Sequence, residues 1–257
     1  MQLSGQVVVV SGAASGLGRR TAEVFARAHG ARVAGLDIAD APADGWMAEH
    51  GPEHAMYLPV DVTDDTAVGV AVLRVLEAFG RIDVCINCAG IPGPLRIVDR
   101  GGEALGCATF RRVVAVNLLG TFNVMSHCAA AMLKNTPSAD GERGVVINTS
   151  SGAAFEGQAG QTAYAASKAG IVGLTLPAAR ELSRHGIRVN AIAPGLFDTP
   201  MAQGAPELLQ SLTAMIEFPK RLGDSAEFAS LCAYICGNQY LNGECIRLDA
   251  ATRLRAR

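Results

Sequence analysis

The sequence predicts an α/β fold: a doubly wound parallel sheet of about seven strands with helices on both faces. Two observations support this prediction. Short apolar runs rich in β-branched residues alternate with longer helical patterns along all 257 residues. The apolar runs are nearly continuous, as in strands that are buried on both faces of a parallel sheet. Because crossovers between parallel strands are right-handed, the intervening helices then cover both faces.

Strands are expected where short β-branched or apolar runs are bounded by glycine or polar residues. In chain order they are Gln6–Val10, Arg32–Leu36, Ala55–Val60, Ile82–Asn87, Gly144–Thr149, Ile187–Ala193 and Glu244–Leu248. Helices are expected where a longer pattern separates two such runs. In chain order they are Leu17–His29, Asp65–Phe79, a long helix around Phe110–Lys134, Tyr164–His185 and Ala226–Cys236. No shift in composition marks a linker, so we expect one domain over residues 1–257.

Two segments fit this alternation poorly. Thr136–Arg143 is polar and is expected to be a surface loop. Leu196–Arg221 follows the sixth strand and carries several prolines and methionines. A long excursion at the carboxyl end of a strand lies where α/β folds bind ligands, so we interpret residues 196–221 as a substrate lid. The alternative is a structural insertion.

The composition is that of a soluble enzyme with much buried sheet, with 49% hydrophobic and 18% charged residues. A formal net charge of −2 gives no reason to expect a nucleic acid or a membrane surface as partner. The apolar run Val7 to Val10 is too short for a signal sequence or a membrane span, and no basic region precedes it. We therefore expect a cytoplasmic protein that acts on a small molecule.

The seven cysteines are an odd number without the spacing of a zinc site. Cys85 and Cys88 form a C-x-x-C match, but positions i and i+3 of a strand face opposite sides. No second pair completes a metal site. We expect reduced thiols, as in a cytosolic compartment, and no bound metal.

Tyr164 and Lys168 form a candidate catalytic pair. Residues four positions apart share one face of a helix, so the phenol and the ammonium can point into one site. The cation is expected to lower the pKa of Tyr164 and to make it a general acid or base. Ser151 ends a strand–loop stretch thirteen residues upstream and can hydrogen-bond the oxygen that Tyr164 protonates. A tyrosine and a lysine on an ordinary amphipathic helix are the alternative.

A glycine-rich turn follows the first strand and opens the first helix. Its candidate cofactor residues are Gly12, Ser15, Gly16, Leu17 and Gly18. The glycines allow a tight turn, and the N–H groups of the helix N-terminus can hold a pyrophosphate, which indicates a Rossmann-type dinucleotide site. Asp37 ends the second strand, where a carboxylate binds both ribose hydroxyls and repels a 2′-phosphate. We therefore expect NAD rather than NADP, although Arg19 and Arg20 follow the turn.

Further candidate cofactor residues lie at the ends of other strands. They are Asp61, Val62, Cys88, Ala89, Gly90, Pro194, Gly195, Phe197 and Thr199. Asp61 and Val62 can meet the adenine edge, and Thr199 can bond the nicotinamide carboxamide. Because the carboxyl ends of parallel strands share one edge, we expect these residues to outline one crevice. Ordinary loop chemistry at a strand end is the alternative for each.

With these motifs in order, the chain resembles the short-chain dehydrogenase/reductase family over essentially its whole length. The motifs are Ser11-Gly-x-x-x-Gly-x-Gly18, Asn87-Cys-Ala-Gly90, Asn117, Ser151 with Tyr164-x-x-x-Lys168, and Pro194-Gly195. The resemblance implies an NAD-linked enzyme that interconverts a secondary alcohol and a ketone. Ser11 stands where the family usually has Thr and Cys88 where it usually has Asn, and both keep a backbone role.

The resemblance also implies residue roles. Tyr164 exchanges the hydroxyl proton, Ser151 holds the substrate oxygen, and Lys168 binds the nicotinamide ribose. Asn117 resembles the residue that orients a proton-relay water to Lys168, although an asparagine within a helix is often bonded to local backbone instead. Gln158 resembles a glutamine that contacts substrate, and an exposed loop glutamine is the alternative.

Several stretches are similar to the subgroup of type 2 3-hydroxyacyl-CoA dehydrogenases, also described as 17β-hydroxysteroid dehydrogenase type 10. They are Ala153–Gln158, Gly170–Pro177, Ala193–Phe197, Arg221–Asp224 and Leu241–Asp249. This similarity implies a 3-hydroxyacyl-CoA substrate, a role in lipid metabolism and a homotetramer. The alternatives are a dehydrogenase of hydroxysteroids or other apolar alcohols, and a non-catalytic nucleotide-binding scaffold. The arginines at the C-terminus (Arg253, Arg255, Arg257) indicate no more than a solvated end.

Overall fold

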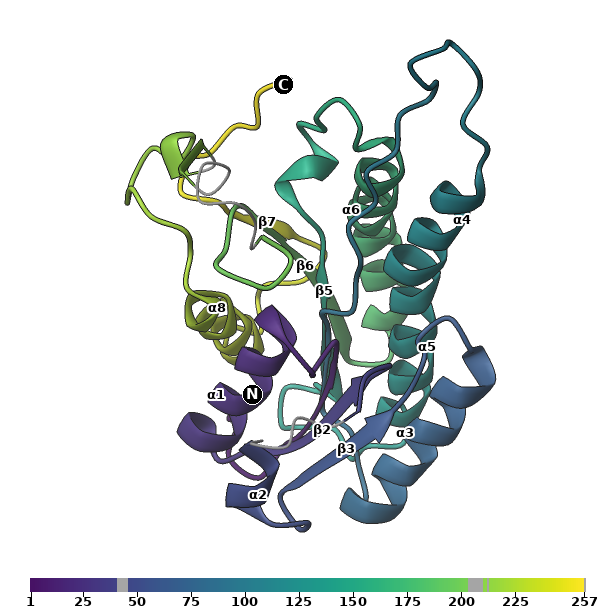
Figure 1. The fold of residues 1–257 in the computed structure, drawn as a ribbon. Coiled ribbons are helices and arrows are strands. Elements are labelled where there is room, and N and C mark those ends of the chain that lie inside the picture. Colours follow the sequence, from purple (N-terminus) through teal and green to yellow (C-terminus); the bar gives the residue numbers. More distant parts are fainter. Residues whose placement is uncertain (41–45, 203–209, 212, 257) are drawn as a thin grey trace.

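The computed structural model describes residues 1–40, 46–202, 210–211 and 213–256 of the chain. In this part of the chain one parallel sheet holds seven strands in the order β3-β2-β1-β4-β5-β6-β7 (Figure 1). The strands are β1 Val7–Ser11, β2 Arg32–Asp37, β3 Ala55–Pro59, β4 Val84–Asn87, β5 Gly144–Thr149, β6 Ile187–Pro194 and β7 Cys245–Leu248. The predicted doubly wound parallel sheet is confirmed.

The sheet changes its direction of growth between β1 and β4. The chain runs from β1 outward through β2 to β3, and it then returns to place β4 on the other side of β1. Ser11 at the end of β1 is level with Asn87 of β4, and Asn87 is level with Asn148 of β5. Open α/β sheets bind ligands outside the carboxyl ends of the strands at such a reversal.

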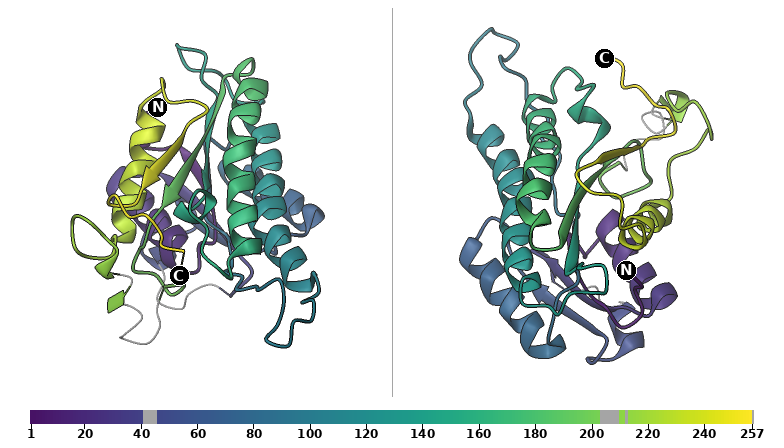
Figure 2. Two further views of the ribbon diagram at one scale, coloured as in Figure 1. Left: turned by 90° about the horizontal axis from the view of Figure 1, so that it is seen from above. Right: turned by 180° about the vertical axis from the view of Figure 1, so that it is seen from behind.

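Helices cover both faces of the sheet (Figure 2). They are α1 Gly16–His29, α2 Trp46–His50, α3 Asp65–Phe79, α4 Ala108–Val114, α5 Thr121–Met132, α6 Thr162–Ser183 and α8 Ser225–Gly237. Because successive strand residues face opposite sides, Val7 and Val9 of β1 enter the core beneath α3, α5 and α6. Val8 and Val10 enter the core beneath α1 and α8. All four valines are fully buried, which explains the continuous apolar run in the sequence.

Within the described ranges, three of the named elements were not predicted. The five residues of α2 are too few to show a helical period, and this helix was not predicted. The predicted long helix contains a π-helical segment, η1 (Ala115–Gly120), between α4 and α5. A 3₁₀ turn, η2 (Gly152–Ala154), begins the predicted loop after β5. π-Helical turns are frequent at functional sites, and η1 carries Asn117.

The helical stretch Ala108–Met132, which comprises α4, η1 and α5, is long and apolar enough by composition to cross a membrane, with a mean hydropathy of 1.4. Its inner face packs into the core beneath the sheet through Val124, Met125 and Cys128. Its outer face is also apolar, since Leu119 and Phe122 are each 54% exposed. We interpret this stretch as a core helix with a second apolar face.

Candidate active site

Polar side chains connect the carboxyl ends of the three central strands. The Ser11 hydroxyl donates to Asn87 Oδ1 at 3.1 Å, and Asn87 Nδ2 donates to Asn148 Oδ1 at 2.9 Å. All three side chains are buried, so they bond one another instead of water. These bonds fix the points at which the chain leaves β1, β4 and β5. Asn148 was not among the predicted site residues, and an asparagine within an apolar strand run is the signal that would have found it.

Ser151, Tyr164 and Lys168 converge above β5. Ser151 is the N-cap of η2, where its Oγ accepts a hydrogen bond from Ala153 N at 3.1 Å. Tyr164 and Lys168 lie on the first turns of α6, and Lys168 Nζ is 5.9 Å from the centre of the Tyr164 ring. The Ser151 side chain is also close enough to the phenol of Tyr164 to lower its pKa. The structure therefore brings together the three side chains that the sequence predicts as catalytic.

Lys168 is held from several sides and is only 5% exposed. Its Nζ donates to the main-chain oxygen of Thr149 at 2.8 Å, and Ser150 Oγ donates to the carbonyl of Lys168 at 2.9 Å. A Cβ at Gly90 would lie 3.5 Å from Lys168 Nζ and 3.3 Å from Asn117 Oδ1. The glycine therefore leaves this corner of the site open.

The prediction that Lys168 lowers the pKa of Tyr164 is wrong. Burial raises the pKa of Tyr164 above its usual value, and hydrogen bonding with Ser151 offsets only part of that rise. Burial also lowers the pKa of Lys168 to about 8. Both shifts disfavour the charged form of the group, as burial does. Burial is the largest cause of both shifts.

Asn117 lies in η1 and is fully buried. Its Oδ1 accepts from Ile91 N at 2.8 Å, and its Nδ2 donates to Ile91 O and to Ser167 Oγ, both at 3.1 Å. The side-chain amide thus anchors the loop after β4 to α6. Its main-chain oxygen accepts from the Thr121 hydroxyl at 2.8 Å.

The glycine turn brings α1 close to the sheet. A Cβ at Gly12 would lie 2.7 Å from Ala89 N, and a Cβ at Gly18 would lie 3.0 Å from Ser11 O. Gly12 also has a φ of 73° and Gly16 a φ of 54°, in the left-handed region that glycine tolerates. Side chains are excluded, and a ligand can approach the backbone closely.

The N-terminus of α1 is open toward this turn. Ser15 is the N-cap, but its side chain makes no capping hydrogen bond. Leu17 is partly buried and packs against the core beneath α1. The uncapped N–H groups and the helix dipole suit a pyrophosphate.

Asp37 stands at the end of β2 beside the turn. Its Oδ2 accepts from Ala14 N at 3.0 Å and its Oδ1 from Ala39 N at 3.1 Å. These bonds hold the carboxylate at the edge where a ribose diol would lie, and a 2′-phosphate would meet its negative charge.

The residues after β3 and β4 border the same edge. Asp61 is exposed and its Oδ1 accepts from Thr63 N at 2.9 Å, whereas Val62 is buried against Gly120 of η1. Burial raises the pKa of the Cys88 thiol to about 12, so Cys88 is a neutral thiol. Ala89 N donates to Ser11 Oγ at 3.4 Å. The predicted backbone contacts therefore lie next to the glycine turn.

The residues after β6 form the opposite side of the crevice. Pro194 ends β6, and Gly195 N donates to Leu248 O at 2.9 Å. Phe197 is buried at 7% exposure. Thr199 lies beside the glycine turn, because a Cβ at Gly16 would be 3.5 Å from the Thr199 Cβ.

The two ends of the predicted lid, residues 196–221, are joined to each other. Asp198 N donates to Gly223 O and Gly223 N donates to Leu196 O, both at 2.9 Å. A cavity of about 1150 Å³ lies between the described parts of this segment and α1, lined among others by Gly16, Pro200 and Lys220. Residues 203–209 and 212 of the predicted lid lie outside the described residues.

Gln158 contacts the C-terminal segment. Its Nε2 donates to the Arg255 carbonyl at 3.0 Å, and its Oε1 accepts from Gln161 Nε2 at 3.2 Å. The side chain is partly exposed, and both ends of its amide are engaged by protein. Of the C-terminal arginines, Arg253 is ion-paired, and Arg257 lies outside the described residues.

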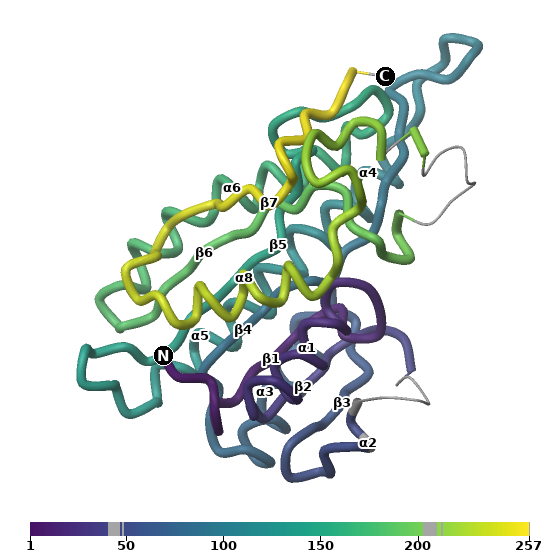
Figure 3. Tube along the Cα trace, turned by 90° about the vertical axis from the view of Figure 1, so that its left-hand side faces the viewer, coloured from purple at the N-terminus to yellow at the C-terminus, as the bar shows by residue number. Residues whose placement is uncertain are grey.

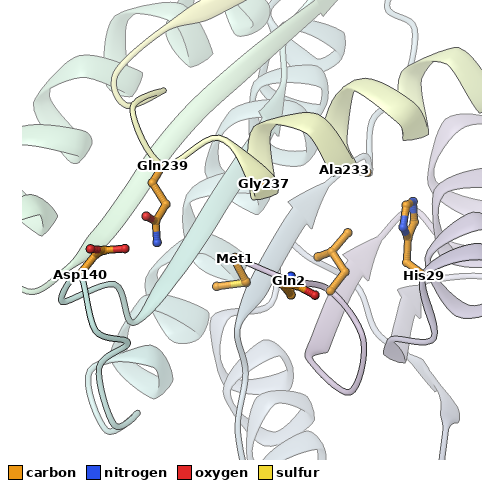
Figure 4. A pocket seen from close by; sticks show the side chains of 8 residues that line it. Met1, Gln2, His29, Asp140, Ala233, Gly237 and Gln239 are labelled. Atoms are coloured by element: carbon orange, nitrogen blue, oxygen red, sulfur yellow. The ribbon is translucent and has the colours of Figure 1, made fainter.

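A second cavity of about 590 Å³ opens at the amino edge of the sheet, away from Ser151 (Figure 4). Met1, His29, Asp140 and Gln239 line it, and this set offers no catalytic arrangement. Among the described residues no three His, Cys, Asp or Glu side chains could hold a metal. All seven cysteines lie in the described part of the chain and are free thiols.

A glycine turn at the N-terminus of α1 and a serine–tyrosine–lysine group at the same edge define a nucleotide-linked oxidoreductase. A model of the short chain dehydrogenase family matches residues 6–209. The chain belongs to this family.

Relatives match over nearly the whole chain. The human 3-hydroxyacyl-CoA dehydrogenase type-2 (Homo sapiens) is 46% identical over 255 residues, which are 98% of this chain and 97% of that protein. The 3-oxoacyl-[acyl-carrier-protein] reductase FabG of Thermotoga maritima is 36% identical over 97% of this chain and 98% of its own length. A crystal structure of 3-hydroxyacyl-CoA dehydrogenase type-2 from Mycobacterium avium superposes with a TM-score of 0.91 at 40% identity, covering 100% of this chain and 99% of that one.

Proposed function

We propose that the protein interconverts a secondary alcohol and a ketone with NAD, and that its substrate is a 3-hydroxyacyl-CoA. The observation that carries this proposal is the convergence of Ser151, Tyr164 and Lys168 at the carboxyl edge of the sheet, beside the glycine turn. A phenol that hydrogen-bonds a serine can share a substrate oxygen with it and exchange a proton there. Fold alone would not support the activity, but these side chains do.

The residues at this edge fit NAD. The glycine turn and the uncapped N-terminus of α1 suit the pyrophosphate, and Asp37 suits the diol of the adenosine ribose. We assign further cofactor contacts to Asp61 and Val62, and to the backbone after β4 and β6. These backbone positions are Cys88, Ala89, Gly90, Pro194, Gly195, Phe197 and Thr199. When bound, the cofactor supplies the hydride acceptor, and the protein supplies orientation and electrostatics.

Each of the remaining residues has a separate role in the reaction. In alcohol oxidation Tyr164, as phenolate, accepts the hydroxyl proton of the substrate. Ser151 donates to the same oxygen and stabilises the charge that develops on it. Lys168 is buried against Thr149, where its Nζ suits the hydroxyls of the nicotinamide ribose. The main-chain oxygen of Asn117 completes a proton relay through water.

The relatives support the substrate class. Proteins named 3-hydroxyacyl-CoA dehydrogenase type-2 from cattle, human, rat, fly and mouse are 45–46% identical to this chain over nearly its whole length. The segment 196–221 would close over the substrate, and Gln158 would border it. This substrate places the protein in lipid metabolism.

We further propose a single domain that assembles as a homotetramer in a cytoplasmic, reducing compartment. The reducing compartment accords with the seven free thiols. Assembly accords with apolar side chains on the outer face of neighbouring helices. They are Phe110, Leu119 and Phe122 on the α4–α5 stretch and Leu176 on α6, each 37–54% exposed.

The test is NAD-linked oxidation of a 3-hydroxyacyl-CoA chain-length series beside a panel of steroid alcohols, followed by NADH absorbance. We expect a high kcat/KM for one range of acyl lengths. Activity on steroids or other alcohols alone would reject the acyl-CoA substrate and keep the chemistry. Silence on both panels with NADH still binding would favour a scaffold.

A further inference from the structure

Arg247 on β7 is the centre of an ionic cluster next to the catalytic serine. Its Nη1 and Nη2 donate to the two carboxylate oxygens of Glu156 at 2.6 and 2.8 Å. Its Nε donates to Asp249 Oδ2 at 2.7 Å, and its guanidinium lies 5.1 Å from the centre of the Phe155 ring. The Arg247 and Glu156 side chains are about three-quarters buried, with exposed fractions of 23% and 26%. A planar, two-pronged contact of this kind fixes direction as well as distance.

One side of this cluster holds the loop that carries Ser151. Phe155 and Glu156 directly follow η2, whose N-cap is Ser151. A Cβ at Gly152 would lie 3.9 Å from Arg247 Nη2, so the residue after Ser151 also packs on the guanidinium. Arg247 therefore contacts the loop at three positions within five residues of the catalytic hydroxyl.

The other side of the cluster holds the backbone at the end of β6, to which we assign cofactor contacts. Arg247 is in register with Ala193 of β6, directly before Pro194 and Gly195. A Cβ at Gly195 would lie 2.7 Å from the Cα of Asp249, which is the second carboxylate that Arg247 binds. The same guanidinium thus connects the loop that carries Ser151 (the serine loop, residues 151–156) with the end of β6.

The C-terminal segment lies beside the loop after β5 (Figure 3), and Arg253 from this segment joins the cluster. Arg253 pairs with Asp249 at 3.0 Å and with Glu156 at 3.4 Å, and Arg247 Nη2 donates to Thr252 O at 3.3 Å. Ala159 N donates to Ala256 O at 3.1 Å. The segment therefore lies along the loop that carries Gln158.

We propose that Arg247 is a positioning residue for catalysis: it sets the Ser151 loop against the end of β6 and holds the C-terminal segment beside Gln158. The inference rests on the proposed function for the role of Ser151. Arg247 acts through Ser151. A displacement of about 1 Å at a reacting group can lower the rate ~10²-fold. If the loop that carries Ser151 became more mobile, kcat should therefore fall.

The first experiment compares Arg247→Met and Arg247→Lys with wild type, using 3-hydroxybutyryl-CoA and NAD. We expect kcat of the methionine variant to fall about 10- to 100-fold, with NADH affinity within about threefold of wild type. Lysine keeps the charge but cannot make the forked contact, so it should restore only part of the rate. Arg27→Met breaks a surface pair with Glu49 at 2.7 Å on α1 and α2, and this control should retain wild-type kcat.

The second experiment asks whether Arg247 acts through Ser151. Hydrogen bonding with Ser151 lowers the pKa of Tyr164, so Arg247→Met should move the alkaline limb of kcat/KM for oxidation to higher pH, as Ser151→Ala should. In a Ser151→Ala background, Arg247→Met should move it no further. Equal shifts in both backgrounds, or no shift at all, would overturn the proposal.

Hydrogen exchange tests, without substrate, whether Arg247 holds the serine loop and the C-terminal segment in place. Peptides over residues 152–160 and 249–256 should exchange faster in Arg247→Met than in Arg27→Met, and unchanged exchange would overturn the proposal. If Arg247→Met does not fold, Glu156→Gln releases the serine loop and leaves the Asp249 pair intact, with the same outcomes expected. A wild type that is silent on 3-hydroxybutyryl-CoA would reject the proposed substrate, and the exchange result would still decide the role of Arg247.

Discussion

At the scale of single residues, burial determines which protonation state of Tyr164 is populated at a given pH. Its pKa is raised by burial, and that of Lys168 is lowered by burial to about 8. The phenol is therefore the stable form at neutral pH, and the phenolate becomes available only in alkaline solution. Ketone reduction needs the phenol and alcohol oxidation needs the phenolate, so the two directions should respond to pH in opposite senses.

We expect kcat/KM for alcohol oxidation to rise with pH through the alkaline range with a slope near one in a logarithmic plot. Reduction should be constant at neutral pH and fall in that same range. Initial rates in both directions, measured between about pH 6 and 11 at saturating cofactor, check this.

Tyr164→Phe is the control for that assignment. It should lower turnover by ~10²–10⁴ and remove the alkaline limb, while NADH binding is kept. A pH-dependent limb that survives in this variant would mean that another group transfers the proton.

The sequence could predict that Ser151, Tyr164 and Lys168 lie together but not how they ionise. Spacing places Tyr164 and Lys168 on one helix face, and chain order places Ser151 at a strand end. Their pKa values depend on how completely α6 and η2 shield them from water, which is a property of packing. The Arg247 cluster escaped prediction for a related reason, because its partners lie on separate segments of the chain.

At the scale of elements, the turn between β1 and α1 depends on the absence of side chains. We expect Gly18→Ala to weaken NADH binding at least about fivefold, because its Cβ would meet the main-chain oxygens of Gly12 and Ser11. Overpacking of this kind costs ~1–3 kcal/mol, and about 1.4 kcal/mol is tenfold in affinity. Fluorescence titration with NADH measures the effect.

Gly237→Ala is the matched control for this prediction. Gly237 ends α8, and no atom lies within 4 Å of the position of an added Cβ. Its NADH affinity should equal that of wild type. Equal affinity in Gly18→Ala would show that α1 can shift without disturbing the turn.

The strands were the most predictable elements and the helix irregularities the least. Strand runs such as Val7 to Val10 are apolar throughout because both faces of the sheet are covered, and the pattern is visible in the sequence. The π-helical turn at η1 follows instead from tertiary contacts, since Asn117 bonds Ile91 and Ser167, and Gly120 packs on Val62. No local periodicity encodes these contacts.

At the scale of the whole molecule, a buried ion pair connects the start of β6 with the segment that precedes β5. Arg188 of β6 pairs with Glu142 at 2.7 Å, and both side chains are under 9% exposed. Arg188 also donates to the carbonyls of Ile235 and Cys236 near the end of α8. An ion pair and its hydrogen bonds thus stabilise the amino ends of these strands, whereas the proposed ligand site lies at the carboxyl ends.

The outer face of the α4–α5 stretch is the surface on which assembly should depend. Leu119 and Phe122 lie three residues apart, so they share one helix face, and each is 54% exposed. α4 and η1 also pack beside α6, which adds the exposed Leu176 to the same region. An apolar face of this kind is stabilised when another copy of the chain covers it.

Replacing Leu119 and Phe122 together with Glu should therefore break the assembly, because association would bury uncompensated charges. Light scattering after size exclusion should give four times the 26.6 kDa chain mass for wild type and a smaller species for the variant. Leu73→Glu on α3, where the leucine is 58% exposed, is the control and should leave the mass unchanged. A wild type that elutes as a single chain would contradict the tetramer, whereas an unchanged variant mass would place the interface on another face of the molecule.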